Sequence, residues 1–251
     1  MRNWKPLGNG VESLFLVTPL TWWINFGVYI YQYKGFQIDA GPLRTLRYRS
    51  RAEALFITHT HEDHAGGAAR LSLPIFTGKE AAYLLQNPPA LSLYRRLVWG
   101  TVKPVRAQAA ERVGSFFILP TPGHSPDHVV IYDEEAGLVF GGDLFLSVRA
   151  NVAPPGFDVE ALMQSLRKVM ELKPRRFFCA HAGDVANPLQ ALAAKLEFLE
   201  KTREQALKLK QKGFHVTEIR DRLFGGESPW ALLSGGTMSR LRFVRALLKE
   251  D

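Results

Sequence analysis

Short apolar runs separated by turn residues dominate the first two-thirds of the chain. They predict strands at residues 27–33, 36–39, 54–58, 74–77, 115–119, 129–132, 138–140 and 176–179. Helical periodicity occurs between these runs, at residues 65–71, 79–85 and 158–172. Strands that alternate with helices predict a layered α/β architecture.

The pattern changes after Asn187-Pro188. Residues 189–212 read as one long helix that ends at Gly213, and shorter helices are predicted at 216–224 and from Thr237 or Ser239 to 248. We therefore expect a domain of residues 1–186 and a C-terminal helical extension of residues 187–251. Apolar stretches are too short or too interrupted for a membrane span or a signal peptide, so we expect a cytoplasmic protein without membrane association.

The amino-acid composition limits the kinds of metal site and partner that the chain can have. The 251 residues include one cysteine, Cys179, which excludes an intramolecular disulfide framework and a cysteine-cluster metal site. Any metal must then be held by histidines and carboxylates. The formal net charge of +8 suits an anionic partner. The basic run of Arg44, Arg47, Arg49 and Arg51 is either a solvated face or a means of attracting such a substrate.

Four of the predicted strands lead into a side chain that can bind metal. Two of these strands stop at His59 and His181, and two others reach His124 and Asp143 through short glycine-containing turns. Polar groups at strand ends gather at one edge of a sheet, where α/β proteins place their ligands. The sequence thus predicts a polar site at such an edge.

The first of these ends carries a dense cluster, His59-Thr60-His61-Glu62-Asp63-His64. In extended backbone alternate residues share a face, so His59 and His61 can bind one ion together. Asp63 and His64 fall at the start of the next predicted helix and can serve a second ion. Imidazole and carboxylate ligands suit zinc, iron or manganese.

These motifs together resemble the metallo-β-lactamase-fold hydrolase superfamily, in particular its glyoxalase II-like branch. The matching elements are His-x-His-x-Asp-His at 59–64, Thr-Pro-Gly-His124, Gly-Gly-Asp143 and His181, with Ile-Asp39-Ala-Gly similar to the first motif. The resemblance implies an αββα four-layer sandwich with a dinuclear site at one edge of the sheets.

Carried over residue by residue, the resemblance implies two ligand sets. The first metal would be held by His59, His61 and His124, and the second by Asp63, His64 and His181, with Asp143 bridging the two. The candidate catalytic residues are Asp63, Asp143, Asp39 and His128. Asp39 and His128 would fix the orientation of ligands.

The expected cofactors are two divalent ions, zinc first, with iron or manganese as alternatives. Such a pair can share a hydroxide that cleaves a small ester or thioester. Metal-dependent phosphodiesterase or nuclease activity, and an iron-dependent persulfide dioxygenase-like oxidoreductase, remain as alternatives. The expected partner is a small anionic or acyl substrate, and the helical extension suits a homodimer better than a nucleic acid. Residues 87–112 are either a lid with aromatic walls and cationic anchors or packing filler.

Overall fold

The computed structural model describes residues 3–45, 47–234 and 236–250. Its strands form two sheets. The first sheet has seven strands in chain order: β1 (Lys5–Gly8), β2 (Val11–Val17), β3 (Gly27–Tyr33), β4 (Phe36–Ile38), β5 (Ala54–Phe56), β6 (Ile75–Thr77) and β7 (Gln108–Ala109). The second has six, ordered β13 (Gly183–Val185), β12 (Arg176–Cys179), β11 (Leu138–Phe140), β10 (Val129–Asp133), β9 (Phe116–Pro120) and β8 (Arg112–Val113).

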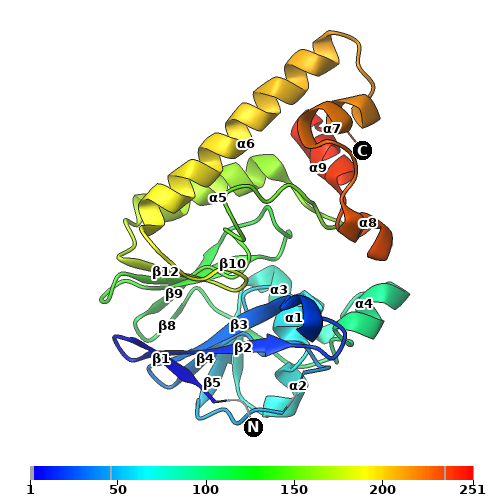
Figure 1. Ribbon diagram of the computed structural model, residues 1–251. Coiled ribbons are helices and arrows are strands. Elements are labelled where there is room, and N and C mark those ends of the chain that lie inside the picture. The colour runs from blue at the N-terminus through cyan, green and yellow to red at the C-terminus, as the bar shows by residue number, and fades with distance from the viewer. Residues whose placement is uncertain (1–2, 46, 235, 251) are drawn as a thin grey trace.

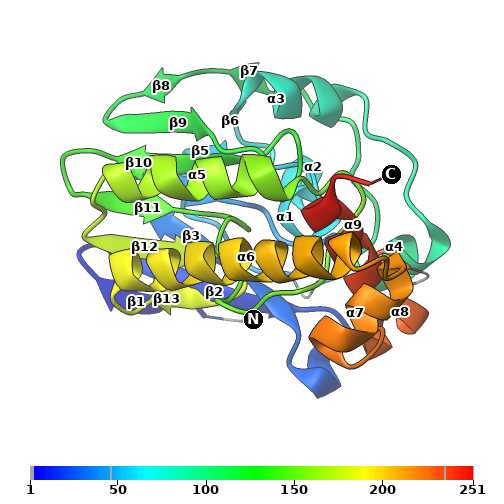
Figure 2. The same cartoon turned by 90° about the horizontal axis from the view of Figure 1, so that it is seen from above.

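Helices cover the outer faces of both sheets. Beside the first sheet lie α1 (Glu62–Ala65), α2 (Ala68–Leu71), α3 (Lys79–Gln86) and α4 (Leu93–Val98) (Figure 1). Over the second sheet, α5 (Val159–Glu171) and α6 (Pro188–Gln211) run side by side (Figure 2). The predicted αββα four-layer sandwich is therefore confirmed.

Aromatic side chains fill the space between the two sheets. Tyr31 and Phe56 from the first sheet belong to the same buried cluster as Phe140 and Phe178 from the second. The rings of Phe140 and Phe178 stack with centroids 5.0 Å apart, and Tyr31 lies 5.3 Å from Phe178. The Tyr31 hydroxyl also donates a hydrogen bond to the Cys179 carbonyl at 2.7 Å, which links the sheets next to the edge where β12 ends.

The remaining helices follow α6 in the chain: α7 (Val216–Phe224), α8 (Pro229–Leu233) and α9 (Arg240–Leu248). Leu192 and Leu199 of α6 and Phe243 of α9 share one buried cluster with Val139 and Phe177 of the second sheet. The helical extension thus packs on the same core as the sandwich, and the boundary after residue 186 stays a prediction. No helix in the described ranges is long and apolar enough to cross a membrane.

Some elements differ from the sequence prediction. The single helix expected at 65–71 is two short helices, because the backbone of Ala40 passes close to the Gly66–Gly67 pair between them. A Cβ at Gly67 would lie 2.3 Å from the Ala40 carbonyl oxygen. Strands β1 and β2 were not predicted, and neither was α4, which lies within the residues 87–112 that were expected to be a lid or packing filler.

Candidate metal centre

All seven predicted metal ligands meet at one edge of the two sheets. One candidate ligand group consists of His59, His61, His124 and Asp143, and the other of Asp63, His64 and His181. Within each group, one possible ligand atom per residue lies within 4.8 Å of those of the other members. The segment after β5 supplies the residues numbered 59–64, and the ends of β9, β11 and β12 lead to the others. The structure thus assembles the two predicted sets, and their ligand roles stay predictions.

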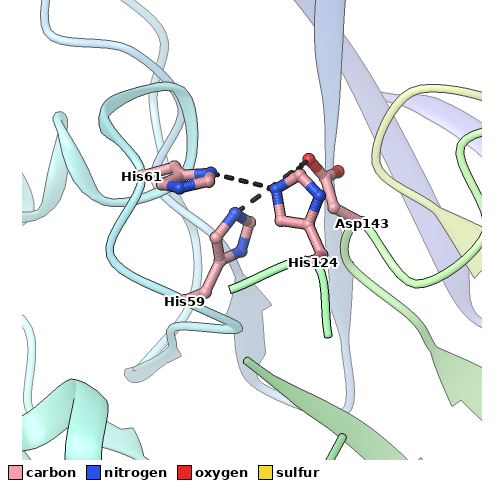
Figure 3. A group of neighbouring side chains, drawn as sticks. All are labelled: His59, His61, His124 and Asp143. Atoms are coloured by element: carbon pink, nitrogen blue, oxygen red, sulfur yellow. Dashed lines mark hydrogen bonds and ion pairs between the residues drawn. The ribbon is translucent and has the colours of Figure 1, made fainter. Parts of the chain in front are cut away.

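Asp143 lies between the two candidate groups. Its Oδ2 is 3.2 Å from His124 Nε2 and 4.0 Å from His59 Nε2, both in the first group (Figure 3). Its Oδ1 is 3.4 Å from Nε2 of both His64 and His181, in the second group. Each carboxylate oxygen therefore faces histidines of a different group, an arrangement that suits a carboxylate bridging two ions.

Hydrogen bonds outside the cluster fix the histidine rings. Nδ1 of His64 lies 2.7 Å from Asp39 Oδ2, and Nδ1 of His181 lies 2.9 Å from the Gly27 carbonyl. Nδ1 of His59 lies 3.1 Å from the Thr58 hydroxyl. In each ring Nε2 is left facing the cluster, which is the way proteins usually orient metal-binding imidazoles.

The two predicted orienting residues lie where this role requires. Asp39 has a positive φ of 59° and accepts the Thr58 backbone N–H at 2.8 Å as well as contacting His64. His128 Nε2 accepts the backbone N–H of Asp143 at 3.1 Å, while its Nδ1 lies 2.9 Å from the Thr121 hydroxyl. His128 thus holds the backbone of the residue that faces both groups.

The chemistry of the cluster fits divalent cations. His59 Nε2, His64 Nε2 and Asp143 Oδ1 are buried and have no hydrogen-bond partner. His64 Nε2 and Asp143 Oδ1 are within ion-pair distance of each other at 3.4 Å, but none of the three atoms makes a hydrogen bond. A buried polar atom without a hydrogen bond costs about 1–3 kcal/mol, so three of them at one place indicate a site completed by a ligand. The set contains only imidazoles and carboxylates, which suits the metals expected from the sequence.

Burial keeps the first group's imidazoles neutral. It lowers the pKa of His61 to about 3, with the nearby Arg95 charge acting in the same direction. The pKa values of His59 and His124 are also lowered, mainly by burial. Neutral rings keep the lone pairs that a metal requires.

The histidines of the second group have their pKa values raised by nearby carboxylates, including Asp63 of the same group and Asp143 of the first. Burial opposes ionisation of Asp143, but the charges of His181 and His64 hold its pKa well below the usual range. Burial likewise opposes protonation of His64 and His181, and the Asp143 charge raises the pKa of both. Buried negative charge of this kind attracts cations, whether protons or metal ions.

A cavity of about 290 Å³ opens onto the candidate ligands. Residues 87–112, expected to be a lid or filler, contribute Tyr94, Arg95 and Trp99 to its wall. Residues of the basic run line other surface hollows. The cavity wall does not include Arg44 or Arg47, so the structure does not place these two arginines at the site.

Two polar interactions at the site were not predicted from the sequence. Asp127 accepts the backbone N–H and the hydroxyl of Thr60, at 2.8 and 2.7 Å, and so holds the loop between His59 and His61. Its position next to His128 was the only local signal. Glu62 and Arg95 form a two-fold ion pair in the cavity wall, and no local pattern connects residues so far apart in the chain.

Comparison with known families agrees with this geometry. Residues 49–181 match the family model described as the metallo-beta-lactamase superfamily. The chain belongs to this superfamily. Its relatives include hydrolases, and the chain is accordingly a metal-dependent hydrolase. The resemblance inferred from the motifs is thereby confirmed.

Individual relatives are distant. A probable metallo-hydrolase of Bacillus subtilis is 28% identical over 66% of this chain and 81% of its own length. An atrochrysone carboxyl ACP thioesterase of Aspergillus fumigatus is 28% identical over 64% of this chain, and a hydroxyacylglutathione hydrolase of Francisella tularensis subsp. novicida is 28% identical over 60%. This chain covers only 48% and 62% of those two proteins.

The similarity in structure covers more of this chain than the similarity in sequence does. A metallo-beta-lactamase family protein from Thermus thermophilus superposes with a TM-score of 0.66 at 18% identity. The superposition covers 96% of this chain and 92% of the other, so the shared fold reaches into the C-terminal helices.

Proposed function

We propose that the protein is a dinuclear metal-dependent hydrolase that cleaves a small ester or thioester. The observation that carries the proposal is the position of Asp143, whose two oxygens face different ligand groups. Two complete groups joined by one carboxylate suit two ions better than one.

Zinc is our first choice for both ions, with iron and manganese as alternatives, because the donors are imidazoles and carboxylates. His59, His61 and His124 would hold one ion, Asp63, His64 and His181 the other, and Asp143 both. When bound, such ions polarise a carbonyl oxygen and lower the pKa of water towards neutrality.

The chain's own residues position the reacting groups. The Asp39 carboxylate keeps the His64 ring turned towards the cluster, and His128 fixes the Asp143 backbone. The cavity beside the ligands presents mainly apolar side chains, such as Leu146 and Val152, which give an apolar acyl group a surface to pack against.

Two relatives support acyl transfer to water. The Aspergillus fumigatus protein is described as a thioesterase, and the Francisella tularensis protein as a hydrolase of hydroxyacylglutathione. We extend this substrate class to the present chain as a proposal. We also propose a reducing, cytoplasmic location, in keeping with the single buried thiol of Cys179.

The alternatives have less support. A phosphodiester would need free cations in the cavity, but in the described part of the chain the only lysine or arginine lining it is Arg95, already paired with Glu62. An oxidoreductase that uses a single iron would leave the second ligand group without a purpose.

Metal content and hydrolysis, measured together, test the proposal. Protein purified without added metal should contain close to two divalent ions per chain and cleave ester and thioester substrates, and a chelator should abolish the activity. His61→Ala should lower both metal content and activity while leaving a cooperative thermal melt. His215→Ala is the matched control, because His215 lies outside the site at the start of α7.

A single bound ion would remove the dinuclear part of the proposal. Full activity in His61→Ala would refute the assigned role of that histidine. Metal-loaded protein that cleaves none of these substrates would overturn the function itself.

A further inference from the structure

The cavity beside the metal ligands is closed by segments from distant parts of the chain. Phe26, which follows the short helix η1 (Trp22–Ile24), forms one side. Trp99 at the end of α4 forms another, and Thr237 and Met238, between α8 and α9, a third. Figures 1 and 2 both show α8 close to α4 at this end of the molecule. The helical extension therefore contributes to the substrate cavity.

Phe26 is the centre of an aromatic cluster. Its ring stacks on the candidate ligand His181, with centroids 5.6 Å apart and planes 7° from parallel. It also packs on Trp99 at 5.6 Å and on Trp230 at 6.4 Å. Phe26 and Trp99 thus give the cavity an aromatic side next to the candidate ligand His181, and Trp230 supports Phe26 from outside the cavity wall.

The two charged side chains in the cavity wall other than the candidate ligands form an ion pair with each other. Apart from the candidate ligands, the charged residues that line the cavity in the described ranges are Glu62 and Arg95. Arg95 donates through Nε and Nη2 to the two oxygens of Glu62, each at 2.6 Å, and the Glu62 side chain is 1% exposed. The Glu62 carboxylate thereby balances the charge of Arg95, which weakens the attraction of this guanidinium for an anionic acyl group.

The C-terminal part of the wall is held in place. Ala153 donates its N–H to the Ser239 carbonyl at 3.1 Å, which joins the wall segment around Val152 and Pro154 to the one containing Met238. The Glu227 carboxylate accepts the Ser239 hydroxyl at 2.8 Å and the Arg240 N–H at 2.7 Å. The wall is thereby built into the fold.

We propose that this cavity is an acyl-binding site for an uncharged apolar acyl group about the size of an aromatic ring. The inference rests on the proposed hydrolase function and deepens it. The volume of about 290 Å³ is near the lower limit of small-molecule sites, which favours a single ring over a long chain. Phe26, Trp99 and Met238 are the specificity-determining residues.

Esters with one leaving group and different acyl groups test this assignment. We would compare p-nitrophenyl acetate, phenylacetate and hemisuccinate as substrates of the metal-loaded protein. Burial of the phenyl ring should raise kcat/KM for phenylacetate at least tenfold above acetate. The anionic hemisuccinate should be the poorest substrate of the three.

A charge-introducing variant sharpens the test. Met238 is only half-buried, so Met238→Lys can fold with its ammonium group at the cavity. Met238→Lys should lower the ratio of kcat/KM for phenylacetate to kcat/KM for acetate about tenfold. It should also raise kcat/KM for hemisuccinate relative to that for phenylacetate. Trp22→Lys adds the same charge at a residue that is 67% exposed and not part of the cavity wall, and should leave these ratios unchanged.

The outcomes separate the two proposals. Hydrolysis of acetate and hemisuccinate as efficient as that of phenylacetate would overturn the acyl-site assignment and leave the hydrolase function intact. Unchanged ratios in Met238→Lys, with acetate still hydrolysed, would do the same. Absence of metal-dependent cleavage of every ester and thioester would overturn the hydrolase function, and the acyl site with it.

Discussion

Lys195 carries a buried ammonium group, and we predict that Lys195→Met changes how stability depends on pH. The residue lies on the inner face of α6 and is 2% exposed. Its Nζ donates to the Ser147 carbonyl at 3.1 Å. Burial lowers the pKa of Lys195 from 10.5 to about 8. Since one pKa unit corresponds to about 1.4 kcal/mol, the buried charge costs about 3 kcal/mol at neutral pH.

The sign of the effect follows from proton binding. Between about pH 8 and 10.5 the unfolded chain binds more protons at Lys195 than the folded chain, because its pKa there is higher. Folding therefore becomes more favourable as the pH rises through this window. With these pKa values, the contribution of Lys195 increases by about 1 kcal/mol between pH 7 and pH 9.

Urea denaturation of the wild type and Lys195→Met at pH 7 and pH 9 measures this contribution. The stability of the wild type relative to the variant should rise by about 1 kcal/mol between the two pH values. The lost Ser147 hydrogen bond and the altered packing affect both measurements equally and cancel. Lys212→Met, at the exposed end of α6, is the matched control and should show no such change. A difference between wild type and Lys195→Met that is equal at both pH values would refute the reasoning.

Two further substitutions test the residues around the metal centre. Arg95→Ala leaves the buried Glu62 carboxylate unpaired and should lower the free energy of unfolding by about 3 kcal/mol in urea denaturation. The double variant Glu62→Gln/Arg95→Ala should recover most of this loss, and a double variant that is equally unstable would contradict the prediction. His128→Ala leaves the Asp143 N–H unpaired and should reduce metal affinity or kcat about 10–100-fold while the thermal melt stays cooperative. Wild-type values of both metal affinity and kcat would refute its orienting role.

The candidate ligands could be predicted from the sequence because their signals are local. His59, His61 and His64 fall within six residues, and the strand that precedes them is a plain apolar run. The residues that reach the same edge from elsewhere, such as Asp143, each follow a recognisable strand. Strand ends and spacing predicted a polar site at one sheet edge, and the resemblance to the superfamily implied how its side chains would divide into two sets.

The cavity wall could be predicted only in part, through the expectation that residues 87–112 form a lid or packing filler. Phe26, Trp99 and Trp230 meet through the packing of η1, α4 and α8, and no periodicity in the chain connects these segments. The sequence contains only a weak indication that Lys195 is buried, namely its helical spacing from Leu192 and Leu199 on the same side of α6. A lysine at such a position is normally taken to be exposed, because an unpaired buried charge is costly.

The candidate ligands come from both sheets. His59, His61, Asp63 and His64 follow a strand of the first sheet, whereas His124, Asp143 and His181 belong to the second. An ion held by residues of both is a cross-link between the two halves of the sandwich, and it is available only to the folded chain. Free metal at about a thousand times its dissociation constant then adds about 4 kcal/mol to the free energy of unfolding. The fraction of the protein that is folded is therefore expected to depend on the supply of metal in its surroundings.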